Sequence, residues 1–243
     1  MISKNGKKLN ILGIIPARGG SKRLPRKNIK LLCGKPLISY SIEEAKKSKL
    51  LDRLFVVTED EEIYNVAKSH GVELIKEPEH LAGDKVVMED VLIHTVKTVV
   101  EEHKFNPHII VLLQPTTPYR TAETIDEAIK KLVEHPEADA IVSVYKAPQH
   151  YNPHWVSKIH DDGYIRPYIG EKYVPLAQLM PEVYWRDGQV YAVYTEKLLE
   201  TGSRYGNKCI PYINREDRYH INIDDELDFM LAELLIEKGL IKP

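Results

Sequence analysis

The residues of this chain best suited to chemistry lie in a glycine-rich, basic stretch near the amino terminus. Gly19 and Gly20 are adjacent there, and five basic side chains surround them: Arg18, Lys22, Arg23, Arg26 and Lys27. Glycines let backbone N–H groups approach an anion closely, and lysine and arginine neutralise its charge. The stretch follows an apolar run, residues 9–15, that predicts a buried strand. A loop of this kind at the carboxyl end of the first strand of an α/β sheet is typical of a phosphate site, although a solvated basic turn is the alternative.

The expected ligand of this basic loop is a nucleoside triphosphate. A triphosphate carries about four negative charges at neutral pH, which calls for basic side chains together with a divalent metal such as Mg²⁺. The loop has neither the Gly-Lys-Ser/Thr ending of a Walker loop nor the Gly-x-Gly-x-x-Gly of a dinucleotide fingerprint.

A second polar loop follows the apolar run 108–113, which predicts a central strand. Two prolines restrict this loop, so Gln114, Thr116 and Thr117 can present an amide and two hydroxyls at little entropic cost. Rigid, uncharged polar groups suit sugar hydroxyls and an N-acyl group. Taken alone, the loop is more simply explained as a proline-rich turn that caps the helix expected from Thr121.

A third group of polar residues follows the apolar residues near position 220. If residues 219–223 form a strand, Asn222 and Asp224 point to the same face, because side chains two apart share a face. Their oxygens make a candidate Mg²⁺ site, since this ion is commonly held by one or two carboxylates and by substrate phosphates. The alternative for Asp224 is the N-cap of the last helix.

Apolar runs alternate with amphipathic segments along most of the chain, which predicts an α/β fold with a mainly parallel sheet covered on both faces. The expected strands are residues 9–15, 53–58, 72–75, 108–113, 138–144, 189–194, 209–213 and 219–223. The expected helices are residues 37–48, 59–70, 88–101, 121–133, 196–200 and 225–238.

The pattern breaks between residues 146 and 188, where prolines and aromatic residues interrupt short alternating pieces. We therefore expect an α/β domain made of residues 1–145 and 189–243, with residues 146–188 as an inserted antiparallel arm. Exposed arms of this kind commonly mediate dimer contacts. The aromatic residues Tyr184, Trp185 and Tyr191 suit an interface, a sugar pocket or ordinary core equally well.

Composition narrows the class of partner. The chain has 243 residues and a net charge of −2, so nothing global indicates nucleic acid or membrane as a partner. Cys33 and Cys209 are far apart and lack metal-binding spacing, and no apolar run is long enough to span a bilayer. A cytoplasmic protein with free thiols is the expectation.

Several motifs, in order along the whole chain, resemble those of the acylneuraminate cytidylyltransferases, the CMP-sialic acid synthetase family. Residues 16–28 resemble its Pro-Ala-Arg-Gly-Gly-Ser-Lys-x-x-Pro-x-Lys-Asn signature, and residues 114–121 resemble its Gln-Pro-Thr-Ser-Pro-Leu-Arg-Thr. Residues 58–63, 187–191 and 221–224 are similar to its Thr-Asp-Asp-Glu-Glu-Ile, Asn-Gly-Ala-Ile-Tyr and Ile-Asp-Ile-Asp.

This resemblance implies a three-layer, Rossmann-like nucleotide-diphospho-sugar transferase fold and an enzyme that joins CMP from CTP to the anomeric hydroxyl of an acidic nine-carbon sugar. It implies that Arg18, Ser21, Lys22 and Lys27, with Gly19 and Gly20, hold the triphosphate and that Asn28 lies near the nucleoside. It implies that Gln114 contacts the sugar, that Tyr191 lines its pocket and that Asp224 binds Mg²⁺. A homodimer through the arm is expected.

The chain departs from the family pattern in three places. Asn222 replaces an acid, residues 84–90 lack the Ser/Thr side chains that relatives carry near the nucleotide, and residues 175–178 lack an Arg-Arg-Gln. These departures favour a relative that uses legionaminate, pseudaminate or another acidic sugar. The alternatives are a nucleotidyltransferase that uses another nucleotide or a sugar 1-phosphate, and a nucleotide-binding regulator with weakened turnover.

Overall fold

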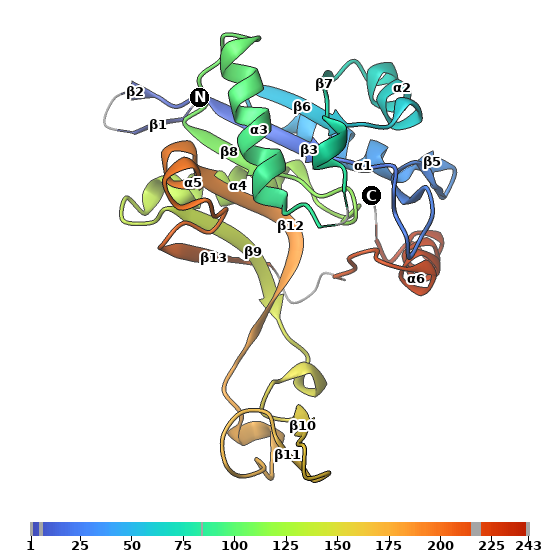
Figure 1. Ribbon diagram of the computed structural model, residues 1–243, viewed down its shortest axis with the longest axis vertical. Helices are drawn as coiled ribbons and strands as arrows, with labels where there is room; N and C mark the ends of the chain where they lie inside the picture. Colours follow the sequence, from blue (N-terminus) through green and yellow to red (C-terminus); the bar gives the residue numbers. More distant parts are fainter. Residues whose placement is uncertain (1, 5–6, 84, 215–219, 242–243) are drawn as a thin grey trace.

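The computed structural model describes residues 2–4, 7–83, 85–214 and 220–241 of the chain, and its centre is a seven-stranded sheet (Figure 1). The strand order is β13-β9-β12-β8-β3-β6-β7. The bounds are β3 Ile11–Pro16, β6 Arg53–Thr58, β7 Glu73–Lys76, β8 Ile109–Leu112, β9 Ala140–Lys146, β12 Tyr184–Tyr194 and β13 Cys209–Ile213.

The sheet is mostly parallel. β3 pairs in parallel with β6 and β8, β6 pairs in parallel with β7, and β13 pairs in parallel with β9. β12 runs antiparallel to both of its neighbours, β8 and β9. Three two-stranded antiparallel ladders complete the described strands: β1 Ser3–Lys4 with β2 Lys7–Lys8, β4 Leu31–Leu32 with β5 Lys35–Pro36, and β10 Ser157–Ile159 with β11 Ile165–Pro167.

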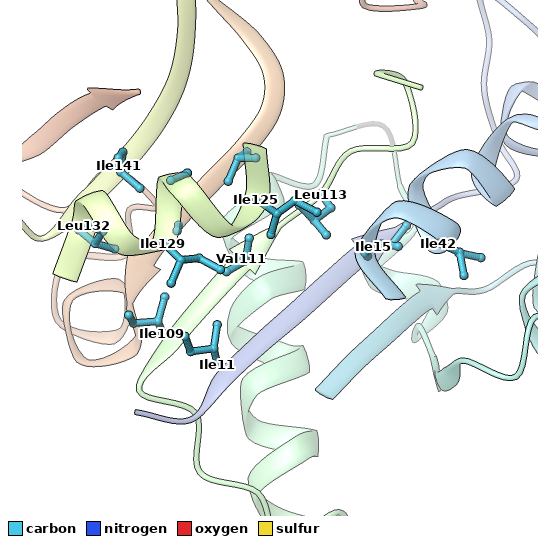
Figure 2. Packing of buried hydrophobic residues seen from close by; sticks show 14 of the residues in the cluster. Ile11, Ile15, Ile42, Ile109, Val111, Leu113, Ile125, Ile129, Leu132 and Ile141 are labelled. Carbon is cyan, nitrogen blue, oxygen red and sulfur yellow. The ribbon is translucent and has the colours of Figure 1, made fainter. Parts of the chain in front are cut away.

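Helices cover both faces of the sheet, which confirms the predicted three-layer α/β class. The helices are α1 Leu37–Lys47, α2 Glu61–Ser69, α3 Met88–Glu101, α4 Ala122–Glu134, α5 Thr195–Thr201 and α6 Glu226–Glu237. Buried residues of α1, α2 and α4 pack on one face, where Ile42, Ile125 and Ile129 meet strand residues such as Ile15 and Val111 (Figure 2). α3 and α5 cover the other face with Leu92, Val96 and Leu198 among others. No helix in the described part of the chain is both long and apolar enough to cross a bilayer.

Side-chain caps at two helix starts bear on the sequence predictions. The Thr121 hydroxyl accepts a hydrogen bond from the Thr124 N–H at the start of α4, as predicted. At α6 the N-cap is Asp225, which forms a capping box with Asp228. The carboxylate of Asp224 is therefore not needed for capping, which removes the alternative explanation for this acid.

The strand predicted at residues 219–223 is wrong within the described residues. Tyr219 lies outside them, and His220–Ile223 form irregular backbone without a strand partner. The segment is instead anchored by Ile223, which is fully buried and whose N–H donates to the Thr116 carbonyl at 2.8 Å. The apolar alternation of Ile221 and Ile223 therefore reflects packing beside α6 rather than a sheet ladder.

β9 and β12 continue beyond the body of the sheet and lead into a projecting segment that carries β10 and β11 (Figure 1). The outer part of this ladder pairs Tyr184 with Lys146 and Trp185 with Tyr145. β12 then changes register between Arg186 and Tyr191, and Gly188 within this bulge has a φ of +76°, a conformation that favours glycine. The long β12 thus connects the projecting segment to the centre of the sheet.

Candidate active site

The carboxyl ends of four neighbouring parallel strands place chemically useful residues on the same face. On the α3 side, buried residues alternate along each strand: Leu112 on β8, Ile14 on β3, Val57 on β6 and Ile75 on β7. Because side chains two apart share a face, the next positions on that side are Gln114, Pro16, Glu59 and Glu77. Polar side chains are therefore expected to gather at the carboxyl ends of these strands, on the face of the sheet that α3 covers.

A cleft of about 630 Å³ opens at this edge. It joins the basic loop, the Gln114 loop and the segment that precedes α6. Its lining residues are Pro16, Ala17, Arg18, Ser21, Lys22, Arg23, Leu24, Lys27, Asn28, Glu77, Leu81, Gly83, Val86, Met88, Val91, Gln114, Pro115, Thr116 and Asp224. The structure thus brings together eight of the predicted site residues: Arg18, Ser21, Lys22, Lys27, Asn28, Gln114, Thr116 and Asp224.

Lys27 ties the basic loop to the segment before α6. Its ammonium group donates to the Ile223 carbonyl at 2.7 Å and lies 3.5 Å from the Asp224 carboxylate. Burial lowers the pKa of Lys27, while Asp224 opposes this shift by attracting the charged form. Arg23 approaches the same carboxylate at 3.4 Å. Lys27 and Arg23 therefore share a single acid, Asp224.

The role of Gly19 differs from the prediction. Its N–H donates to the Glu59 carboxylate at 2.8 Å, so this group is engaged within the protein rather than turned toward an anion. A Cβ at Gly19 would lie 2.9 Å from Cγ of Asp60, so only glycine fits this close approach. Asp60 caps α2 and is held by Arg26, and the loop is thereby fixed to that helix. Gly20 is exposed with open space beside it, and neither glycine lines the cleft.

Asn28 is a buried anchor at the cleft wall. Its amide donates to the Arg18 carbonyl at 2.9 Å and so fixes the backbone from which the Arg18 side chain extends. Asn28 follows Lys27 within a single turn of 3₁₀-helix, Lys27–Ile29. The residue before that turn, Arg26, has a φ of 57°, in the left-handed region. This tight turn directs Lys27 and Asn28 into the cleft.

A fully buried arginine, Arg120, holds the Gln114 loop in place. Its guanidinium donates to the Gln114 carbonyl at 2.6 Å, the Gln189 carbonyl at 2.6 Å and the Thr117 hydroxyl at 3.1 Å. Burial lowers the pKa of Arg120 to about 9, and the negative charge of Asp187 opposes this shift. Because the backbone of Gln114 is fixed in this way, the Gln114 amide and the Thr116 hydroxyl are available to line the cleft.

Two residues predicted to bind the sugar do not line the cleft. Thr117 is 2% exposed, and its hydroxyl donates to the carbonyls of Gln114 and Gly188, so it is a structural member of the loop. Tyr191 is 7% exposed, and its ring packs against Tyr205 and under Arg204. Both residues face the interior, because the bulge in β12 turns the polar contacts of this strand inward.

Asp224 and Asn222 lie next to each other, as the metal-site hypothesis requires, although no strand aligns them. The Asn222 amide donates to the Asp224 carboxylate at 3.1 Å. Among the described residues no cluster of three or more His, Cys, Asp or Glu side chains could hold a metal by itself. The Asn222 amide nitrogen faces the carboxylate and Asn222 does not line the cleft, so Asp224 is the metal ligand that this arrangement presents, for an ion that takes its other ligands from substrate phosphates.

Glu77 is the cleft residue that was missed in the sequence. It is 5% exposed and follows β7, where its N–H extends the ladder by donating to the Thr58 carbonyl. Burial, together with the negative charge of Glu59, raises its pKa to about 7, and Arg18 opposes this shift. The available signal was its position two residues beyond Ile75, on the face of β7 that points toward α3.

Replacing Arg120 should destabilise the protein strongly. In Arg120→Met the carbonyls of Gln114 and Gln189 lose their donor and Asp187 loses its counter-charge, so we expect a loss of about 3–5 kcal/mol in the free energy of unfolding. Urea denaturation measures this loss. Arg120→Lys keeps the charge without the forked donor geometry and should recover only part of it. If the free energy of unfolding of Arg120→Met were within about 1 kcal/mol of the parent value, the hydrogen bonds of Arg120 would not be needed for stability.

Glu77 should make stability depend on pH in a definite direction. Its pKa is raised from 4.5 to about 7 in the folded chain, so the folded state binds the proton more tightly and loses stability as pH rises through this window. The free energy of unfolding of Glu77→Gln, taken relative to that of the parent, should therefore rise by on the order of 2 kcal/mol from about pH 5 to about pH 8. Denaturant titrations at both pH values measure this. Glu79→Gln changes an exposed acid of the same loop and serves as control; equal pH profiles for Glu77→Gln and the parent would refute the shift.

Comparison with known proteins places this arrangement in a family. The chain matches the family model described as Cytidylyltransferase over residues 12–215. A CMP-N,N'-diacetyllegionaminic acid synthase of Legionella pneumophila is 32% identical over 235 residues, which cover 94% of this chain and 97% of that protein. An N-acylneuraminate cytidylyltransferase of Escherichia coli is 30% identical over 228 residues, 94% of this chain but 52% of that protein, so the chain spans about half of its length.

Solved structures share the fold at lower identity. A CMP:2-keto-3-deoxy-manno-octonic acid synthetase complexed with CTP aligns with a TM-score of 0.68 at 17% identity, covering 95% of this chain and 99% of that one. A 4-diphosphocytidyl-2C-methyl-D-erythritol synthase from Anaerococcus prevotii aligns with a TM-score of 0.64 at 14% identity, covering 94% and 96%. The match to the family model over most of the chain and the legionaminic acid synthase relative together show that this chain belongs to the cytidylyltransferase family.

Proposed function

We propose that this protein transfers CMP from CTP to the anomeric hydroxyl of a nonulosonic sugar acid and releases pyrophosphate. The observation that carries the proposal is that one cleft joins the basic loop, the Gln114 loop and Asp224. These are the parts needed to hold a triphosphate, a polyhydroxylated acceptor and a metal-bound phosphate. The names of the relatives, which include CMP-legionaminic acid synthase and N-acylneuraminate cytidylyltransferase, support it.

The basic end of the cleft suits the triphosphate. Arg18, Lys22 and Lys27 supply positive charge along one wall, and the Ser21 hydroxyl lies beside them. Charge-assisted hydrogen bonds from such groups neutralise the phosphate oxygens and hold the α-phosphorus still. The chain then needs no covalent intermediate, because positioning and charge neutralisation are the main contributions to phosphoryl transfer.

The acid end of the cleft suits Mg²⁺. Asp224 would hold the ion, which when bound supplies positive charge against the phosphate oxygens. Lys27 and Arg23 already hold Asp224 at the cleft wall, so its carboxylate is positioned before any ligand arrives. Their charges also limit how much negative charge this wall presents to an incoming triphosphate.

The Gln114 loop, whose Thr116 carbonyl accepts from the N–H of Ile223 next to Asp224, suits the sugar acid. Gln114 and Thr116 line the cleft with an amide and a hydroxyl, and Arg120 keeps their backbone rigid. The arm residues 175–178 lack the paired arginines noted above, so recognition of the sugar carboxylate must differ from that in sialic acid synthetases. We therefore propose legionaminate, pseudaminate or a similar bacterial-type acidic sugar as the acceptor. Exposed thiols at Cys33 and Cys209 suit the reducing cytoplasm.

The activity is tested by incubating the protein with CTP, Mg²⁺ and a panel of nonulosonic acids and measuring pyrophosphate release. We expect release with at least one member of the panel and a CMP-sugar product by mass spectrometry. Folded protein that stays silent across the panel contradicts the proposal. Release with UTP or GTP in preference to CTP would favour a different nucleotidyltransferase, and activity only after Asn222→Asp would favour a binding protein that has lost turnover.

Lys27→Ala should weaken triphosphate binding. It removes a buried ammonium group from the wall of the cleft, and the loss of one charge-assisted contact is expected to cost about 1–3 kcal/mol of binding free energy. Isothermal titration with CTP and Mg²⁺ measures it. Lys30→Ala is the matched control, because Lys30 pairs with Glu226 at 2.7 Å and does not line the cleft. Equal CTP affinity of the Lys27 variant and the parent would remove this loop from the site.

We further propose that the segment 146–188 forms a homodimer contact. Many of its large apolar residues are exposed, including Trp155, Ile159, Ile165, Leu179 and Trp185. A concentration of large exposed apolar residues in one projecting segment is typical of an interface between subunits. The two-stranded ladder β10–β11 is too small to form a core of its own, which also favours a partner surface.

The double substitution Ile159→Lys and Ile165→Glu should convert the dimer to a monomer. The two residues are cross-strand partners, so opposite charges keep the ladder paired while they remove its apolar surface. Sedimentation velocity at micromolar concentration measures the assembly state. Leu199→Glu, which alters an exposed leucine on α5, is the control. A monomeric parent protein, or a variant that dimerises as well as the parent, would refute the contact.

A further inference from the structure

The side chain of Glu77 is largely buried, and its carboxyl oxygens lack a hydrogen-bond partner within the described residues although they are not fully closed off from the cleft. The residue is 5% exposed, yet in the described part of the chain no hydrogen bond or ion pair reaches its side chain. A buried polar group without a partner is costly and rare in folded proteins, and where one occurs it calls for an explanation. Because Glu77 lines the cleft, a ligand in the cleft is the natural source of the missing hydrogen-bond donor.

The surroundings of Glu77 indicate which part of a nucleotide lies there. The wall that follows it along the chain is apolar: Leu81, Val86, Met88 and Val91 line the cleft. Lys22 and Lys27, which we propose to bind the phosphates, come instead from the basic loop, another part of the cleft lining. A flat, apolar-faced ring suits the apolar residues, and the triphosphate suits the basic loop. Glu77 therefore lies with the residues that would surround the nucleobase.

Burial and the charge of Glu59 raise the pKa of Glu77 to about 7, so above neutral pH its carboxyl group is mostly ionised and only accepts hydrogen bonds. The carboxylate of Glu59 lies close enough to disfavour a second negative charge, and Arg18 offsets this in part. Glu59 itself is already committed through one oxygen to the Gly19 N–H. A neutral N–H group from a ligand would satisfy Glu77 without bringing in a further negative charge, whereas a carbonyl oxygen would face an acceptor.

We propose that Glu77 selects cytosine by accepting a hydrogen bond from its exocyclic amino group, an inference that rests on the proposed use of CTP. An ionised carboxylate only accepts hydrogen bonds, so it matches the N4 amino group of cytosine. Uracil presents the O4 carbonyl at the same place and meets acceptor with acceptor. Sites built to pair with one polar group reject the analogue that leaves it unpaired.

This assignment addresses a gap in the sequence pattern. The segment 84–90 contains no Ser or Thr side chain that could form a hydrogen bond with a base, so a polar contact must come from another residue. Glu77 supplies a polar group on the same wall of the cleft. It is a specificity residue rather than a catalytic one, because the basic loop and Asp224 handle the phosphates.

The test compares CTP and UTP binding to the parent, Glu77→Gln and Glu79→Gln at about pH 8, by isothermal titration without sugar. We expect the parent and Glu79→Gln to prefer CTP. Glu77→Gln should narrow this preference at least tenfold, since a glutamine amide can turn its N–H toward O4 and its oxygen toward N4. With a sugar acid present, the ratio of turnover with CTP to turnover with UTP should also be lower for Glu77→Gln than for the parent.

An unchanged CTP to UTP ratio in Glu77→Gln would overturn the assignment, as would a parent that binds neither nucleotide. A variant that keeps this ratio but no longer discriminates CTP from 2′-deoxy-CTP would show that Glu77 contacts the ribose instead. Measuring nucleotide binding and sugar turnover separately distinguishes the proposed transferase activity from the proposed contact between Glu77 and the base. CTP selectivity that depends on Glu77 without turnover on any sugar would refute the transferase and leave the base contact standing.

Discussion

The rest of the site depends on the burial of one guanidinium group. Arg120 lies beneath the Gln114 loop and donates to that loop and to β12, so two strands that meet antiparallel are joined at the cleft through a single side chain. A buried charge is tolerable only when its donors are used and a counter-charge is near. The carbonyls of Gln114 and Gln189 and the negative charge of Asp187 meet both needs. Arg120 therefore fixes the Gln114 loop from its buried side. The side of the loop that faces the cleft stays available to a ligand.

At the basic loop, a second, mostly buried cation, Lys27, also holds a backbone carbonyl in place. Lys27 reaches across about 200 residues of sequence to the carbonyl of Ile223, and Ile223 in turn donates to the loop that contains Thr116. Each of the three segments that line the cleft is thus held by another of them. None is fixed by a regular ladder alone, which explains why residues 220–223 need no strand to bring Asn222 beside Asp224.

Much of this architecture could be predicted from local patterns. The strand at Arg53–Thr58, the helix at Met88–Glu101 and the strand at Cys209–Ile213 end where their apolar patterns end. Apolar alternation misled at residues 219–223, because Ile221 and Ile223 pack against α6 and nothing in the local pattern separates this packing from a strand. Thr117, Tyr191 and Glu77 were misjudged or missed because burial depends on contacts between distant segments. The bulge in β12 and the position of β7 at the sheet edge decide those contacts, and neither can be read from spacing.

The arm and the sugar end of the cleft share one continuous strand. β12 begins in the projecting segment at Tyr184, passes through the bulge at Gly188, where a Cβ would lie 2.9 Å from the Gln114 amide oxygen, and ends in the body of the sheet at Tyr194. The same backbone therefore runs from the arm to a position beside Gln114, so the conformation of β12 at Gly188 sets both where the arm leaves the sheet and how closely this strand approaches the cleft lining.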